Sequence, residues 1–270
     1  MKDKNLRRQT MGMSTLLGLR RQGFFSPYRY ADQVKEPQPY RALEAVFQRS
    51  SPEMEAVLRD ISAAMPELTV LNGPPPIPRW DQSWFPRLDG AAAFAMIRRH
   101  RPARIVEVGS GHSTRMLAYA AGPDVRIDCI DPQPRADIEA LPLTLHRAVL
   151  GPEHFPLFDA LEPGDIAFFD SSHILWPGSD VDIILNRIIP ALAPGILIHI
   201  HDILLPDPYP EEWEWRGYTE QTGVAPLLLG ATEVLFSSHF ALTRLGAARH
   251  LADIPLPDGA LETSLWLRRK

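Results

Sequence analysis

Residues 103–114 decide the fold and read Ala-Arg-Ile-Val-Glu-Val-Gly-Ser-Gly-His-Ser-Thr. A β-rich apolar run stops at Gly109, Gly111 follows, and Ser113 and Thr114 open an amphipathic segment. This order predicts a strand, a tight glycine turn and a helix N-terminus, where unpaired backbone N–H groups can bind a negatively charged ligand. The stretch therefore predicts a site for a nucleotide-like cofactor, and an ordinary turn without a ligand is the alternative.

The residues on either side of the turn separate the candidate cofactors. A dinucleotide-binding fingerprint needs a third glycine where this chain has Thr114. Glu107 stands two residues before the first glycine. In these features the stretch resembles the first motif of class I S-adenosylmethionine (SAM)-dependent methyltransferases. The resemblance implies that Glu107 lies under the methionine end of SAM. It disfavours the second interpretation, a nicotinamide-dependent oxidoreductase built on the same type of sheet.

Composition is that of an enzyme-sized soluble protein. The chain has 270 residues, 45% of them hydrophobic, which suits one α/β domain plus an accessory segment. A net charge of −5 gives no electrostatic basis for binding nucleic acid or an anionic membrane. No apolar run approaches the roughly 18 residues that span a bilayer. The N-terminus lacks an apolar signal core, and the single cysteine, Cys129, cannot form an internal disulfide. We therefore expect a cytoplasmic protein.

The sequence predicts two parts of the chain, with the boundary at residue 79. Residues 1–79 are predicted to form an N-terminal helical and aromatic extension with a linker, and residues 80–270 the SAM-binding methyltransferase domain. Apolar residues three and four apart predict two helices within 40–64, broken around 50–52. The aromatic segment 23–30 is expected to pack on the main domain or on a second subunit, as in a homodimer.

Strands and helices alternate from residue 103 onward. The predicted strands are 103–109, 125–131, 143–149, 165–170, 195–202, 232–238 and 264–269. The predicted helices are 113–121, 135–141, 155–161, 180–192 and 218–229, preceded by one near 89–100. Continuous apolar strands suit a sheet buried on both faces. We predict an α/β fold with a doubly wound, mostly parallel, Rossmann-like sheet. The methyltransferase resemblance implies seven strands, the last of them antiparallel.

Ligands bind outside the carboxyl ends of the strands in such a sheet. Asp131 ends the second predicted strand, 22 residues after Gly109. A carboxylate there can accept both ribose hydroxyls, and capping of the next helix is the alternative role. The residues predicted to bind SAM are Glu107, Gly109, Ser110, Gly111, Ser113, Asp131, Asp170 and Ser171.

The fourth and fifth predicted strands also deliver polar side chains at their ends. Asp170 directly follows a buried apolar strand and precedes His173 by three residues. Strand alternation places His199 and His201 on one face, with His199 deeper and hydrogen-bonded in the core. His201 and Asp202 lie at the mouth of the site. Asp170, His201 and Asp202 together are candidate ligands for Mg²⁺ or Mn²⁺.

This arrangement resembles that of cation-dependent O-methyltransferases of the catechol type. These enzymes have an aspartate ending the fourth strand, a basic residue three positions later and an acidic/amide pair ending the fifth. Asp170, His173 and the pair His201-Asp202 occupy those places. The resemblance implies that His173 is the base that takes the hydroxyl proton, a role suited to a group titrating near neutrality. A carboxylate is usual where this chain has His201, so a metal-free alternative pairs His173 with His201, and we favour it slightly.

A wider pattern covers about residues 80–240. Asp170-Ser-Ser-His, Pro194-Gly195 and His199-Ile-His-Asp202 resemble the bacterial methyltransferase domain 24 family. The resemblance implies a SAM-dependent methyltransferase, and we expect a small-molecule hydroxyl as acceptor, with His173, His201 and Asp202 as catalytic residues. N- or carboxyl-methylation on the same fold is an alternative, although the chain lacks the N-P-P-Y-like sequence that marks amino-group methylation. A catalytically silent scaffold is a third possibility.

The segment 204–221 contains two tryptophans, an arginine and several prolines. A loop of this composition beside the active end is a candidate substrate lid. Trp, Tyr and Arg are also common in protein interfaces, so a homodimer contact is an equally good interpretation.

Overall fold

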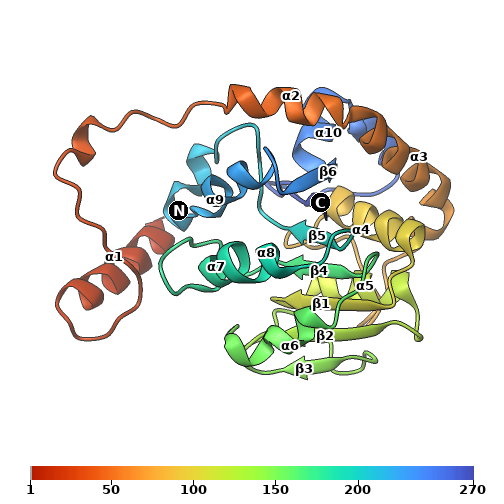
Figure 1. Ribbon diagram of the computed structural model, residues 1–270, viewed down its shortest axis with the longest axis horizontal. Coiled ribbons are helices and arrows are strands. Elements are labelled where there is room, and N and C mark those ends of the chain that lie inside the picture. Colours follow the sequence, from red (N-terminus) through yellow and green to blue (C-terminus); the bar gives the residue numbers. More distant parts are fainter. Residues whose placement is uncertain (1) are drawn as a thin grey trace.

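The computed structural model describes residues 2–270 and shows a seven-stranded sheet in the order β3-β2-β1-β4-β5-β7-β6 (Figure 1). The strands are β1 (Arg104–Val108), β2 (Arg126–Ile130), β3 (Thr144–His146), β4 (Ile166–Phe169), β5 (Leu197–Ile200), β6 (Thr232–Ser237) and β7 (Leu265–Arg269). β1 to β5 pair in parallel, and β7 runs antiparallel to both β5 and β6. The predicted strands and the predicted class I methyltransferase fold are confirmed.

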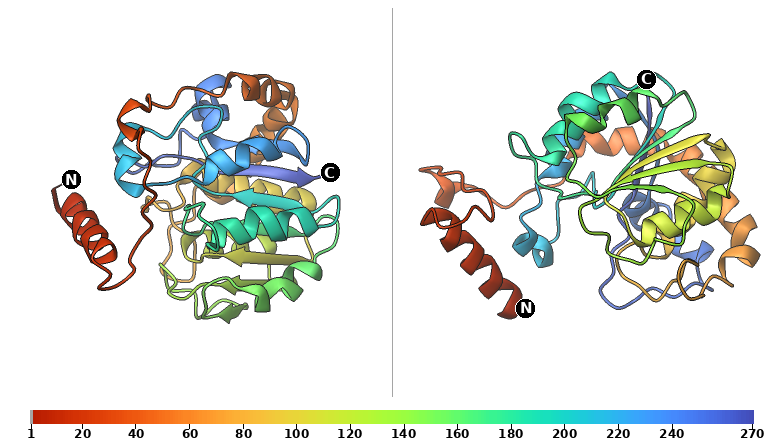
Figure 2. Two further views of the ribbon diagram at one scale, coloured as in Figure 1. Left: turned by 60° about the vertical axis from the view of Figure 1, so that its left-hand side comes forward. Right: turned by 90° about the horizontal axis from the view of Figure 1, so that it is seen from below.

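Helices cover both faces of this sheet, with α3, α4 and α5 on one side and α6, α7 and α8 on the other (Figure 2). The α-helices are α1 (Lys2–Leu16), α2 (Arg41–Arg49), α3 (Ser51–Leu68), α4 (Arg87–His100), α5 (His112–Ala121), α6 (Phe155–Asp159), α7 (Asp180–Ile183), α8 (Ile189–Ala191), α9 (Glu220–Leu227) and α10 (Ser238–Arg244). A π-helical turn, η3 (Ile184–Ile188), joins α7 to α8. The 3-10 helices are η1 (Ala31–Gln33), η2 (Pro152–His154), η4 (Glu211–Arg216) and η5 (Ala247–His250).

The helix predicted at 135–141 is wrong. This segment is a series of bends and turns, because Pro132 and Pro134 fix the backbone and remove two N–H donors. The amide of Arg135 instead donates to the carbonyl oxygen of Ser110 at 3.1 Å. The chain after β2 is thereby tied to the glycine turn after β1.

The division at residue 79 does not separate two cores. Leu43 and Phe47 of α2 and Met54 and Leu58 of α3 are buried in the same hydrophobic core as the sheet. The ring of Phe47 stacks on Phe240 of α10 with centroids 5.3 Å apart. α2 and α3 are therefore part of the α/β domain.

Residues 2–39, which precede α2, form an N-terminal arm. α1 stands away from the rest of the molecule (Figures 1 and 2). Arg8 donates to the carbonyl oxygen of Glu214 at 3.4 Å, and Phe24 stacks on Trp176 with centroids 5.1 Å apart. The arm thus contacts the segments that follow β4 and β5. Phe25, Tyr28 and Tyr30 stay exposed, so packing of the aromatic segment 23–30 on a second subunit stays a prediction.

Candidate functional site

The glycine turn after β1 is fixed by the ends of two neighbouring strands. Gly109 has φ +80°, and a Cβ atom there would overlap the carbonyl oxygen of Asp170. The amide and the hydroxyl of Ser110 donate to one oxygen of Asp131, at 2.6 and 3.0 Å. The amide of Gln133 donates to the other oxygen at 2.7 Å. Asp131 and Asp170 therefore both lie against the turn.

Glu107 lies beneath the turn and is completely buried. Its carboxylate accepts the hydroxyls of Ser113 and Thr114, both at 2.6 Å, and the thiol of Cys129 at 3.2 Å. Burial raises the pKa of Glu107 to about 7, against the opposing effect of these three donors. Glu107 therefore holds the first turn of α5 in place, and its direct contact with SAM stays a prediction.

A first pocket opens beside the glycine turn. It is lined by Trp84, Phe85, Ser110, Gly111, His112, Ser113, Arg135 and Asp170. Four predicted cofactor residues, Ser110, Gly111, Ser113 and Asp170, are among these. The other four were not predicted from the sequence. Trp84 and Phe85 precede α4 in an aromatic run, His112 begins α5, and Arg135 lies in the segment predicted to be a helix. The roles of Gly109, Asp131 and Ser171 in binding SAM stay predictions.

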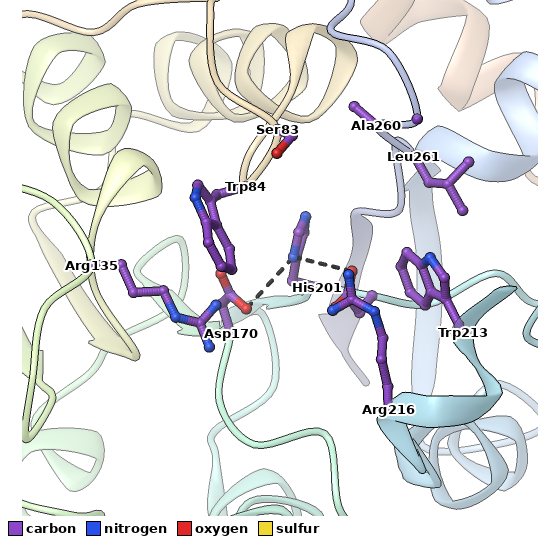
Figure 3. A pocket seen from close by; sticks show the side chains of 11 residues that line it. Ser83, Trp84, Arg135, Asp170, His201, Trp213, Arg216, Ala260 and Leu261 are labelled. Carbon is purple, nitrogen blue, oxygen red and sulfur yellow. Dashed lines mark ion pairs between the residues drawn. The ribbon is translucent and has the colours of Figure 1, made fainter. Parts of the chain in front are cut away.

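A second pocket adjoins the first and shares Trp84, Arg135 and Asp170 with it (Figure 3). It is lined by Ser83, Trp84, Arg135, Asp170, His201, Asp202, Trp213, Arg216, Gly259, Ala260 and Leu261. The structure thus brings Asp170, His201 and Asp202 together, as predicted from the strand ends. His173 lies next to them and is buried, with 2% of its surface exposed.

Two carboxylates and two imidazoles alternate around this site. His173 Nε2 lies 3.2 Å from Asp170 Oδ1 and 3.4 Å from Asp202 Oδ2. His201 Nδ1 lies 3.6 Å from an oxygen of each carboxylate. His173 and Asp202 have φ of +59° and +55°, in the left-handed region that non-glycine residues rarely adopt. Such strain is often found at functional sites, and here it belongs to two adjacent members of the site.

A third carboxylate holds His173 from behind. Glu220 of α9 is 1% exposed, and its Oε2 lies 2.7 Å from His173 Nδ1. Burial by itself would lower the pKa of His173, but Asp202, Asp170 and Glu220 together hold it well above the usual value of 6.5. Each ring nitrogen of His173 therefore faces a carboxylate, and these carboxylates favour the protonated ring.

His201 is held in the same way by a carboxylate of α4. Its Nε2 lies 3.2 Å from Asp89 Oδ2, and Asp89 also accepts the amides of Thr263 and Ser264 at 2.9 to 3.0 Å. Burial would lower the pKa of His201, but Asp170, Asp202 and Asp89 together hold it well above 6.5. Asp89 and Glu220 were not identified from the sequence, because neither lies near its histidine along the chain.

The structure gathers the three predicted cation ligands on one pocket. His201 Nδ1 lies 3.6 Å from an oxygen of Asp170 and 3.6 Å from an oxygen of Asp202. As they are arranged, the side chains of residues 6–270 include no group of three or more His, Cys, Asp or Glu that could hold a metal ion. The assignment of Asp170, His201 and Asp202 as ligands of Mg²⁺ or Mn²⁺ therefore stays a prediction.

His199 is a core residue, as its depth in the strand predicted. It is fully buried, its Nε2 lies 2.9 Å from the Ser264 hydroxyl, and its ring stacks on Phe168 with centroids 3.7 Å apart. Burial and the neighbouring His201 hold its pKa well below 6.5, so the ring is neutral.

Residues 106–203 match a family model described as a methyltransferase domain, and the match runs from β1 to just beyond β5. It includes Glu107, Asp131, Asp170 and Asp202. The match favours the methyltransferase interpretation of these residues. The nicotinamide-dependent alternative is thereby set aside.

Several solved structures are similar to this chain. An O-methyltransferase from Bacillus cereus in complex with S-adenosylhomocysteine is 14% identical, with 86% of this chain and 96% of that chain covered and a TM-score of 0.45. The methyltransferase PaMTH1 from Podospora anserina, bound to S-adenosylhomocysteine, is 17% identical, with 92% and 99% covered and a TM-score of 0.43. The MycE methyltransferase of the mycinamycin biosynthetic pathway, in complex with Mg, S-adenosylhomocysteine and mycinamycin VI, is 19% identical, with 64% and 47% covered and a TM-score of 0.37. No curated protein matches the chain.

Proposed function

We propose that this SAM-dependent methyltransferase methylates a hydroxyl oxygen of a small molecule, with Asp202 as the proton acceptor. One observation supports the proposal above the others: the pocket at the glycine turn and the pocket at Asp202 share Asp170. A methyl donor in the first pocket would face an acceptor in the second. SAM supplies an already activated methyl group, so the protein needs only to align the two reactants and remove a proton.

The proton removal follows from the chemistry of the transfer. The acceptor oxygen forms a bond to the methyl carbon as the carbon–sulfur bond breaks, and the bonded hydroxyl becomes strongly acidic. A carboxylate then suffices as the base. Asp202 faces the pocket, and its Oδ1 accepts the Thr263 hydroxyl at 3.1 Å. His173 was predicted to be the base. Because each of its ring nitrogens faces a carboxylate, we assign it instead the role of positioning Asp170 and Asp202.

The identity of the methylated atom tests this proposal. The protein is incubated with SAM carrying an isotope-labelled methyl group and a small-molecule extract of the cells that contain it. We expect the carbon shift of the transferred methyl group to be that of a methyl ether. The shift of an N-methyl group or of a methyl ester would show that one of the two alternative methylations takes place instead.

We further propose a cytoplasmic homodimer formed through the N-terminal arm. Exposed apolar side chains cluster on the arm, among them Leu16, Leu17, Phe25 and Tyr28. The segment 204–221 remains the alternative interface. No helix in residues 2–270 is long and apolar enough to cross a membrane. Light scattering on the protein from a cytosolic extract is expected to give the mass of two chains, and the mass of one chain would contradict the dimer.

A further inference from the structure

Two guanidinium groups line the proposed acceptor pocket. Arg216 comes from η4 and Arg135 from the loop after β2, and both side chains are directed into the pocket from different sides (Figure 3). The ion pairs formed by arginines among the side chains of residues 6–270 do not include either of them. The pocket therefore has two positive charges that no protein carboxylate neutralises directly.

Arg216 is held by aromatic rings instead of by acids. Its Cζ lies 4.5 Å from the ring centre of Trp213, 5.2 Å from that of Trp215 and 5.3 Å from that of Tyr218. Its Nη1 donates to the Tyr218 hydroxyl at 2.8 Å. Its Nε is buried without a hydrogen-bond partner among the described residues. Aromatic faces orient a guanidinium without cancelling its charge, so the group is prepared for an anion that the protein itself does not supply.

The two carboxylates on the same wall do not neutralise Arg216. Asp170 and Asp202 each lie within 3.6 Å of imidazole nitrogens of both His173 and His201. The two carboxylates therefore interact with these imidazole rings and not with Arg216. Arg135 is similarly placed over an aromatic ring, with its Cζ 4.7 Å from the ring centre of Trp84.

We infer that the methyl acceptor is a hydroxylated acid, and that Arg216 binds its carboxylate or phosphate group while the hydroxyl lies at Asp202. A guanidinium matches both anions through paired N–H donors, and its free Nε is one of the donors that such pairing uses. Arg135 faces the same space and adds a second positive charge. This inference rests on the proposed methyl transfer to a small molecule.

Anion-exchange fractionation of the natural acceptor tests the inference. An extract of the cells that contain the protein is separated at neutral pH on an anion exchanger, and each fraction is incubated with the enzyme and methyl-labelled SAM. We expect the label to enter a compound from the retained fraction. Treatment of that fraction with phosphatase removes the acceptor if the anion is a phosphate ester and leaves it if the anion is a carboxylate. An acceptor found only in the unretained fraction overturns the inference. Label in no fraction overturns the proposed function itself.

Substitution of Arg216 tests its role. Arg216→Gln is expected to raise the KM for the retained acceptor by about 10- to 100-fold, the range for a lost charge-assisted hydrogen bond, with an unchanged Kd for S-adenosylhomocysteine. Arg216→Lys keeps the charge without the planar fork and should give an intermediate KM. The control is Arg59→Gln on the exposed surface of α3, which should leave KM unchanged. A KM for Arg216→Gln equal to that of the control, or a rise matched by an equal loss of S-adenosylhomocysteine affinity, would assign Arg216 a purely structural role and overturn the inference.

Discussion

Asp202→Asn is expected to lower kcat by about 10²- to 10⁴-fold, the contribution of a positioned proton acceptor, and to leave the Kd for SAM unchanged. Asparagine keeps the size of the side chain and tolerates the positive φ of +55° at this position, so the backbone need not move. Only the proton-accepting carboxylate is lost. The measurements are conversion of SAM to S-adenosylhomocysteine in the presence of the acceptor fraction and calorimetric titration with SAM.

A matched variant and two conditions make this result specific. Asp253→Asn changes an exposed aspartate and should retain the kcat of the unsubstituted protein. Because neighbouring carboxylates hold the pKa of His173 well above 6.5, the ring stays charged and the rate should not rise through that pH. A rise near pH 6.5 that His173→Ala removes would restore His173 as the base. Complete loss of activity with EDTA, regained with Mg²⁺ or Mn²⁺, would instead support the predicted cation site.

Gly109→Ala is expected to destabilise the protein by about 3 kcal/mol or more and to abolish SAM binding. The positive φ of +80° alone strains any other residue by about 1 to 2 kcal/mol. The added Cβ would also overlap the backbone carbonyl oxygen of Asp170, which a side-chain rotation cannot relieve. Urea denaturation gives the change in the free energy of unfolding, and calorimetry with SAM gives the binding.

Gly122→Ala is the control for this effect. Gly122 follows α5 with a similar φ of +77°, but a Cβ there has no atom within 4 Å. It should therefore show the conformational strain alone and keep SAM binding. Equal destabilisation by the two substitutions would show that the close approach of β1 and β4 at Gly109 carries no cost.

Local sequence signals located the parts of this fold. The apolar runs that became β1, β4 and β5 are recognisable because a parallel strand buried on both faces needs apolar residues at successive positions. Gly109 and Asp131 each follow directly on an apolar run, so they mark the ends of strands through neighbouring residues alone. The same local signals failed at 135–141, where the hydrogen bond from Arg135 to Ser110 joins two distant turns.

The sequence by itself determined the fold class and the meeting of Asp170, His201 and Asp202, because parallel strands end at one edge of the sheet. Only the tertiary structure decided the charge states at that edge. Glu220 is 47 residues from His173, and Asp89 is 112 residues from His201, yet each carboxylate is buried against its imidazole. A pKa depends on the charges that folding brings within a few ångströms in a dry interior, and no pattern along the chain contains that information.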